Sequence, residues 1–248
     1  MEAKKIRPVS GSSWQKAQEE FYSKGEHKHL QWGEHSLYSR LLAERLCATL
    51  GLSLEQNLLE VGCGAGRFTP HLLDRVENVT ALDNSKSLLD SLARNAGHQT
   101  KLHLRLASVY DLPSQFPRES FDAVGGFFVL HHLENIKACL AAAKSVLKTG
   151  GRIGSIEPNR RNPLFVLQVL CCPDMTWKAE KGLFQFNPAT TMRQLAALGF
   201  RDVRLERFRF FPPQILDNWP GAFRLQQKLE GVRPLYPLLP FVLISGTK

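Results

Sequence analysis

Short apolar runs and amphipathic stretches alternate through the first two thirds of the chain. Runs of strand length and apolar character occupy 57–61, 78–82, 102–106, 121–130 and 152–156. Patterns with helical spacing occupy 36–50, 68–75, 85–95 and 134–147. Strands that alternate with helices of about ten residues favour a parallel sheet covered on both faces. The pattern predicts an α/β, doubly wound, Rossmann-like fold whose seven-stranded sheet is mostly parallel.

This alternation ends after Glu157, where prolines become frequent. A helical pattern returns at 191–198, and strand patterns follow at 203–210 and 241–245, with a helix near 222–229 between them. We therefore expect an N-terminal helical cap at 1–53 and a cofactor-binding core at 54–160. A lid insertion at 161–190 and the C-terminal part of the sheet at 191–248, which contains a Pro-rich lid segment at 211–240, complete the predicted organisation.

The composition is that of an ordinary globular protein. The chain has 248 residues, of which 43% are hydrophobic and 22% charged, and this balance excludes disordered, collagen-like and disulfide-scaffold chains. The five cysteines show no CxxC spacing, so we expect reduced thiols and no metal site. No run reaches the roughly 18 apolar residues of a membrane span, and the N-terminus lacks a secretory apolar region. These features predict a cytoplasmic protein.

The net charge of +9 permits several anionic partners. No run of Lys and Arg exceeds two residues, however, and a nucleic-acid footprint would gather its basic residues on one face. Nucleic acid is therefore not expected as a partner. Anionic substrates and acidic lipid surfaces remain compatible with the charge.

A glycine-rich turn follows the first predicted strand. Residues 60–66 read Glu-Val-Gly-Cys-Gly-Ala-Gly, and Asp83 ends the next strand 21 positions after Gly62. Glycines let a ligand lie directly on the backbone, and an acid at that spacing accepts hydrogen bonds from two ribose hydroxyls. A dinucleotide fingerprint would need glycine where Arg67 stands. The bulky Arg67 disfavours a dinucleotide. S-adenosylmethionine, which contains adenosine but no phosphates, is one candidate ligand, and another nucleotide on a generic Rossmann loop is the alternative.

The motif and three later segments resemble the class I S-adenosylmethionine-dependent methyltransferases. Phe-Asp-Ala-Val at 121–124 is similar to the family's fourth strand, and Val-Leu-His-His-Leu at 129–133 to the segment that follows it. Residues 147–152 are similar to the turn into strand five. The resemblance covers about residues 55–157 and implies that S-adenosyl-L-methionine is the cofactor.

The resemblance also implies roles for single residues. Those expected at the methionine end of the cofactor are Glu60, Gly62, Cys63, Gly64 and Gly66. Asp83 would bind the ribose, and Asn84 would flank the ribose or the adenine. Ser108 and Val109 are expected beside the adenine. Phe127 is expected near the sulfonium, and Tyr22 over the cofactor. For Phe127 and Tyr22 the alternatives are core packing and a surface aromatic.

Methyl transfer to a hydroxyl benefits from a general base, because the hydroxyl must lose its proton. His131 and His132 follow the fourth strand, and Glu157 ends the fifth. These strand ends meet at the edge where open parallel sheets bind ligands. We expect His131 or His132 to act as the base with Glu157 as its partner. The alternative is that one histidine only packs and the other binds the backbone.

The lid segments are apolar and aromatic, with Trp219 among their aromatic residues and arginines between them. This composition favours an apolar, amphiphilic or lipid-linked small molecule as acceptor, and it suits peripheral contact with a membrane. We expect O-methylation. The alternatives are C-methylation of a quinone-like or lipid-linked acceptor, methylation of a macromolecule, for which the basic charge is the only support, and a catalytically silent, cofactor-binding partner subunit. The identity of the acceptor and the oligomeric state do not follow from the sequence.

Overall fold

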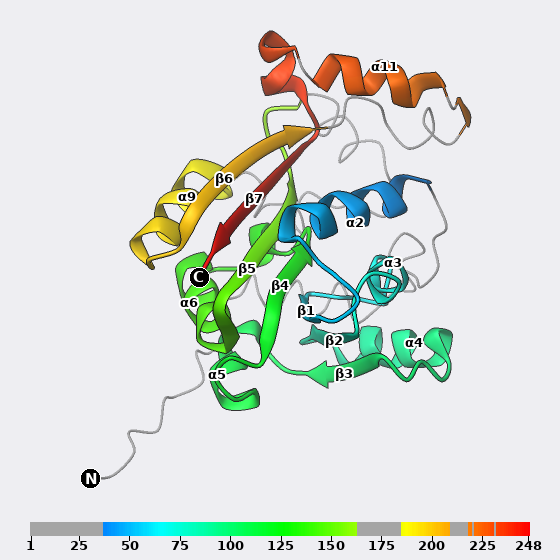
Figure 1. Cartoon of the computed structure of the whole chain (residues 1–248), viewed down its shortest axis with the longest axis vertical. Coiled ribbons are helices and arrows are strands. Elements are labelled where there is room, and N and C mark those ends of the chain that lie inside the picture. The colour runs from blue at the N-terminus through cyan, green and yellow to red at the C-terminus, as the bar shows by residue number, and fades with distance from the viewer. Residues whose placement is uncertain (1–36, 163–184, 209–217, 220, 231) are drawn as a thin grey trace.

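A computed structural model describes residues 37–162, 185–208, 218–219, 221–230 and 232–248 (Figure 1). Its strands are β1 (Asn57–Val61), β2 (Asn78–Asp83), β3 (Leu102–Leu106), β4 (Phe121–Phe127), β5 (Leu147–Pro158), β6 (Arg201–Phe208) and β7 (Phe241–Thr247). They form one sheet in the order β3-β2-β1-β4-β5-β7-β6. Among the described strands, β7 alone runs in the direction opposite to the others. The predicted fold class is confirmed.

Helices cover both faces of this sheet (Figure 1). The α-helices are α2 (Leu37–Leu50), α3 (Thr69–Leu73), α4 (Lys86–Ala96), α5 (Leu112–Gln115), α6 (Ile136–Val146), α9 (Pro188–Ala197) and α11 (Gly221–Glu230). Three 3-10 turns are η2 (Val109–Asp111), η3 (Leu130–His132) and η4 (Arg233–Leu238). Helices α2, α3 and α4 pack in one hydrophobic cluster, and α5, α6 and α9 in the other. None of the described helices is long and apolar enough to cross a membrane.

The central strands are apolar on both sides because both sides are covered. Leu58 and Leu59 are neighbours on β1, are both fully buried, and belong to opposite clusters. The edge strand β3 differs. Its alternation of leucines with polar residues predicts one buried face, but Leu104 and Leu106 are exposed. Its place at the end of the sheet explains this difference, because less of the protein covers an edge.

Two glycines let α2 lie close to the sheet. Gly125 on β4 and Gly154 on β5 are partners in register. A Cβ atom at either position would come within about 3.2 Å of Leu46 on α2, and Leu50 lies equally close to the Gly154 position. Side chains at these two positions would push α2 outward and open the core.

Strand β4 ends earlier than its apolar run predicts. The run continues to Leu130, but the strand stops at Phe127 because Phe128 adopts a φ of 56°. A non-glycine residue in this left-handed region turns the chain sharply. The following residues form η3, which carries His131 and His132 back toward the end of β5. Most of the predicted lid insertion lies outside the described residues, and the domain boundaries remain predictions.

Candidate functional site

The glycine turn after β1 has the backbone that its sequence predicts. Gly62 and Gly64 have φ values of 67° and 55°, and the N–H groups of Gly62 and Cys63 donate to the Leu82 carbonyl at 2.8 and 3.1 Å. A Cβ on Gly62 would lie 2.6 Å from Val129 Cγ2, whereas the space beside Gly64 is open. The turn is therefore packed on one side and open at Gly64, as a ligand cradle requires.

Asp83 at the end of β2 faces this turn. Its Oδ2 accepts a hydrogen bond from Gly64 N at 2.8 Å, and its Oδ1 accepts one from Ser85 N at 2.8 Å. Burial raises the pKa of the carboxyl, while these backbone donors lower it. Each carboxylate oxygen has a further lone pair, so both can also accept from the vicinal hydroxyls of a ribose. The remaining acceptor positions of Asp83 fit the ribose of an adenosyl group beside Gly64.

Glu60 is the third feature of this region. Its side chain is buried, and Thr69 Oγ1 donates to Glu60 Oε2 at 2.7 Å. Burial raises the pKa of Glu60 to about 8, and the charge of Asp83 acts in the same direction. The carboxyl group is thus largely protonated at neutral pH without a cation nearby. A positive group bound beside it would favour the ionised form.

The remaining expected cofactor residues lie in different environments. Asn84 is exposed, and Ser108 caps η2 by accepting from Tyr110 N at 3.3 Å, while Val109 is buried. Phe127 is buried and stacks on Phe68 with ring centroids 4.0 Å apart, which is the packing alternative considered for it. Two further expected cofactor residues belong to the glycine turn. Gly66 has a φ of 89°, and burial raises the pKa of the Cys63 thiol. Tyr22 lies outside the described residues.

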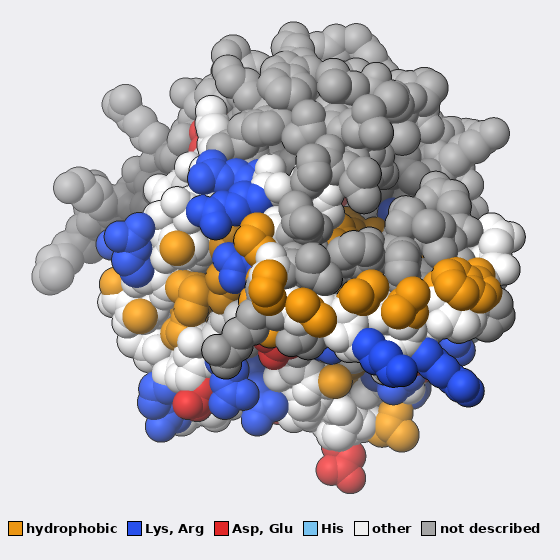
Figure 2. Space-filling view, turned by 90° about the horizontal axis from the view of Figure 1, so that it is seen from above, with side chains coloured by type: hydrophobic (Ala, Val, Ile, Leu, Met, Phe, Trp, Pro, Cys, Tyr) orange, Lys and Arg blue, Asp and Glu red, His pale blue; other side chains and the backbone are white. Residues whose placement is uncertain are grey.

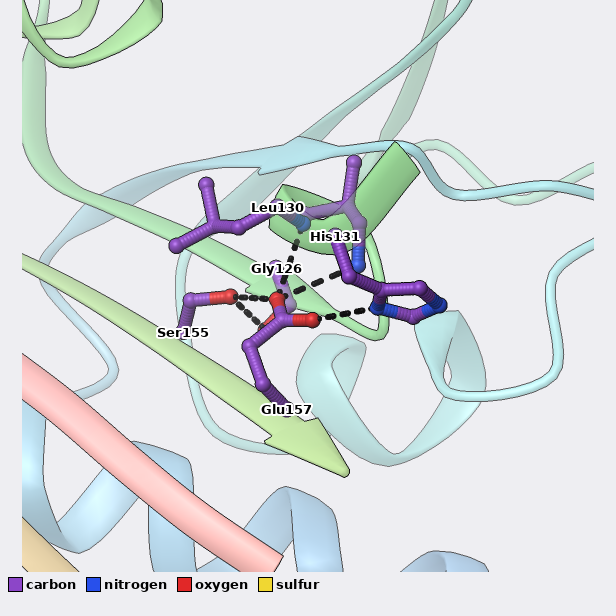
Figure 3. Close-up of polar contacts among 6 residues, drawn as sticks. Gly126, Leu130, His131, Ser155 and Glu157 are labelled. Atoms are coloured by element: carbon purple, nitrogen blue, oxygen red, sulfur yellow. Dashed lines mark hydrogen bonds and ion pairs between the residues drawn. The ribbon is translucent and has the colours of Figure 1, made fainter. Parts of the chain in front are cut away.

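Glu157 brings the two candidate catalytic segments together (Figure 3). Its carboxylate is fully buried, and Oε1 accepts from Leu130 N at 2.9 Å, Val129 N at 3.2 Å and Ser155 Oγ at 2.6 Å. Its Oε2 lies 2.7 Å from His131 Nδ1. A carboxylate only accepts hydrogen bonds, so Nδ1 carries the hydrogen and Nε2 is the basic nitrogen of the ring.

His132 has a different environment from His131. The two rings lie 3.9 Å apart at their centroids, tilted by 42°. Burial lowers the pKa of His132 well below its usual range, and the charge of His131 lowers it further. Glu157 Oε2 contacts the ring of His131 at Nδ1. This contact makes His131 the stronger candidate for the base, whose role stays a prediction.

Sequence reasoning missed Ser155, Thr69 and Val129. Ser155 stands two positions before Glu157 on β5, so strand alternation alone puts both side chains on one face and could have identified it. Thr69 lies just beyond the glycine turn, and no spacing rule links it to Glu60. Val129 packs against the Gly62 and Gly126 positions, a contact that only the fold reveals.

Comparisons with known proteins agree with this geometry. Residues 59–154 match a family model described as a methyltransferase domain. A ubiquinone biosynthesis O-methyltransferase of Xanthomonas campestris pv. campestris is 30% identical over 175 residues, 70% of this chain and 72% of that protein. A demethylmenaquinone methyltransferase of Tropheryma whipplei is 35% identical over 107 residues, 43% of this chain and 44% of that protein. The chain spans 57% of the length of a Xylella fastidiosa ubiquinone biosynthesis O-methyltransferase.

Solved structures share the fold at low sequence identity. A SAM-dependent methyltransferase from Archaeoglobus fulgidus has a TM-score of 0.60 at 17% identity, over 85% of this chain and 94% of that chain. Geranyl diphosphate C-methyltransferase from Streptomyces coelicolor has a TM-score of 0.62 at 16% identity, over 97% and 99%. The chain belongs to the class I S-adenosylmethionine-dependent methyltransferases, and S-adenosylmethionine is its cofactor, as predicted.

Removal of the Asp83 carboxylate should weaken cofactor binding. We expect Asp83→Ala to lower the affinity for S-adenosylhomocysteine at least tenfold, because two charge-assisted hydrogen bonds to the ribose are lost. Isothermal titration calorimetry measures this affinity. Asp90→Ala on α4, where Asp90 pairs with Lys86 at the surface, is the matched control and should bind as the parent does. Equal affinity in both variants would contradict the assigned ribose contact.

The raised pKa of Glu60 predicts a pH-dependent stability. Between the ordinary pKa of 4.5 and the folded value of about 8, the folded chain holds more protons than the unfolded chain. The free energy of unfolding of the cofactor-free protein therefore falls as the pH rises through this range. Glu60→Gln does not ionise and should exceed the parent in stability at pH 8 by up to about 4 kcal/mol.

Urea denaturation at pH 5 and pH 8 measures this difference. The exposed Glu77→Gln is the control, and its stability should follow the parent at both pH values. The same pH dependence in Glu60→Gln and in the parent would show that Glu60 is ionised in the fold.

Loss of the Glu157 carboxylate should destabilise the fold as well as the site. Glu157→Gln replaces one accepting oxygen by an NH2 group. This group is itself a donor and would face the donors that now bind the oxygen. We expect the free energy of unfolding to fall by about 3 kcal/mol in urea denaturation, because buried donors lose their acceptor. The exposed Glu55→Gln, which makes the same chemical change outside the network, should stay within about 0.5 kcal/mol of the parent.

Proposed function

We propose that the protein transfers a methyl group to a hydroxyl oxygen of an apolar, quinone-like small molecule, with His131 as general base. The observation that carries this proposal is the buried contact of 2.7 Å between His131 Nδ1 and Glu157 Oε2. A carboxylate in this position fixes the tautomer and orientation of the ring and stabilises the imidazolium that forms.

The bound cofactor supplies a methyl group already activated by its sulfonium. The chain then has to align the acceptor with this methyl group and to remove the hydroxyl proton. In our proposal the hydroxyl would donate to His131 Nε2, which would take the proton as the oxygen–carbon bond forms and the methyl carbon separates from the cofactor sulfur, which keeps the bonding electron pair. Glu157 would hold Nδ1–H throughout this transfer. His132 stays neutral beside the base, since the pKa of its ring is depressed.

The proposed acceptor class draws on the relatives and on the lid. One relative is named a ubiquinone biosynthesis O-methyltransferase, and ubiquinone is an apolar molecule. The expected lid segments are rich in aromatic residues. Among those described, Phe186 is buried in the core cluster of α6 and α9, whereas Trp219 is 54% exposed.

C-methylation of a quinone-like ring is the second candidate. Its support is the similarity to the demethylmenaquinone methyltransferase over 107 residues. The two candidates give different products from one acceptor, because the new methyl group is bound either to oxygen or to a ring carbon. Proton NMR of the product separates a methoxy signal from a ring-methyl signal.

The role of His131 can be tested with a short-chain alkyl catechol as acceptor. We expect His131→Asn to lower kcat by about 100-fold or more, while the affinity for S-adenosylhomocysteine is retained. His132→Asn should keep kcat within a few-fold of the parent. A folded His131→Asn variant that methylates the catechol at the parental rate would exclude His131 as the base. A ring-methylated product would favour C-methylation instead.

A further inference from the structure

Helix α11 lies near the carboxyl ends of the parallel strands, where the candidate site also lies. It belongs to the connection between the end of β6 and the start of β7. Both β6 and β5 run antiparallel to β7, so β6 is parallel to β5 and the connection lies at the carboxyl ends of the parallel strands. The glycine turn, Asp83 and Glu157 stand at the same edge. Figure 1 shows α11 beyond the tip of β6.

The connection is tied directly to the strand of Glu157. Asn159 follows Glu157 by two positions and is 4% exposed. Its backbone N–H donates to the Pro240 carbonyl at 2.7 Å, and its Nδ2 donates to the carbonyls of Leu239 at 2.7 Å and Pro237 at 3.1 Å. These bonds hold η4 and the start of β7 to the end of β5. The residues between α11 and β7 are therefore tied to the end of the strand that carries Glu157.

The outer side of this segment is apolar and basic. Trp219, Leu225 and Val232 are 54%, 41% and 41% exposed, and they are half of the six large hydrophobic residues that are exposed in the described part of the chain. Arg224 and Lys228 on α11 are also exposed, while Ala222 and Gln226 are buried on its inner side. Figure 2 shows a row of hydrophobic side chains over this end of the molecule with Lys and Arg beside it.

We propose that this outer side, defined by Trp219, Leu225, Val232, Arg224 and Lys228, docks onto an anionic lipid surface. Tryptophan and leucine enter the boundary between headgroups and acyl chains, and basic residues beside them attract acidic headgroups. The positive net charge of the whole chain acts in the same direction. The choice of lipid as occupant rests on the proposed apolar acceptor, which a membrane would present to the edge of the sheet that carries His131.

The apolar part is tested by flotation of the purified full-length protein with vesicles. We expect the protein to bind vesicles of phosphatidylcholine and phosphatidylglycerol, and Trp219→Ser with Leu225→Ser to lower the partition coefficient about tenfold or more. Leu54→Ser with Leu106→Ser is the matched control, since these residues are 64% and 52% exposed elsewhere, and it should bind as the parent does.

The charged part is tested by reversal of two basic residues. Arg224→Glu with Lys228→Glu should lower binding to the phosphatidylglycerol vesicles about tenfold or more, and raised salt should weaken the binding of the parent. Arg94→Glu with Lys137→Glu changes the net charge equally on two other helices and should bind clearly better than the α11 pair. Unchanged thermal melting and S-adenosylhomocysteine affinity show that the variants are folded.

The proposal is overturned if the parent does not bind these vesicles, or if the control pairs lose binding as the α11 pairs do. If the molar mass of the protein in solution rises with its concentration, and is lower in the Trp219→Ser, Leu225→Ser variant, the surface binds a second copy of the chain instead. The assay needs neither cofactor nor acceptor. Failure of vesicle binding with intact catechol methylation refutes the lipid surface alone, and the opposite result refutes the proposed chemistry alone.

Discussion

The site is organised by one buried carboxylate. Glu157 is removed from solvent, and four hydrogen-bond donors satisfy its side-chain oxygens. Two of them are backbone N–H groups of the segment after β4, so the carboxylate fixes that segment as well as the ring of His131. Val129 in the same segment packs against the Gly62 position of the glycine turn. The same group thus positions the proposed base directly and the cofactor turn through Val129.

The three acidic side chains at the carboxyl ends of the strands differ in the number of hydrogen bonds that they accept. Glu157 receives four hydrogen bonds, Asp83 two from the backbone, and Glu60 one from Thr69. At Glu60 and Asp83, burial raises the pKa of the carboxyl group, and the hydrogen bonds that the carboxylate accepts lower it. Glu60, with a single donor, therefore has its pKa raised to about 8. A positively charged ligand beside Glu60 would lower the pKa of this carboxyl group and favour its ionised form. The environment of Glu60 therefore suits a ligand that carries positive charge.

The sequence predicts those parts of the structure that depend on local patterns. Apolar runs locate the strands because parallel strands are buried on both faces, and Asp83 follows from its distance to the glycine turn. The pairing of Glu157 with a histidine follows from strand ends that share an edge. The choice between His131 and His132 depends on the turn at Phe128, where a bulky residue adopts a positive φ. No residue pattern marks this turn, since tertiary packing imposes it.

The two edges of the sheet use their polar groups differently. At the amino ends of the strands, Asp122 accepts from Asn57 N at 2.9 Å and from Lys148 Nζ at 2.8 Å, so its polar atoms pair within the protein. At the carboxyl ends, the backbone beside Gly64 is open and Asp83 keeps accepting capacity. Strands of a parallel sheet all end at the same edge, so residues far apart in sequence meet there. The hydrogen bonds of Asn159 tie η4 and the start of β7 to that same edge, next to the surface that we propose to dock onto lipid.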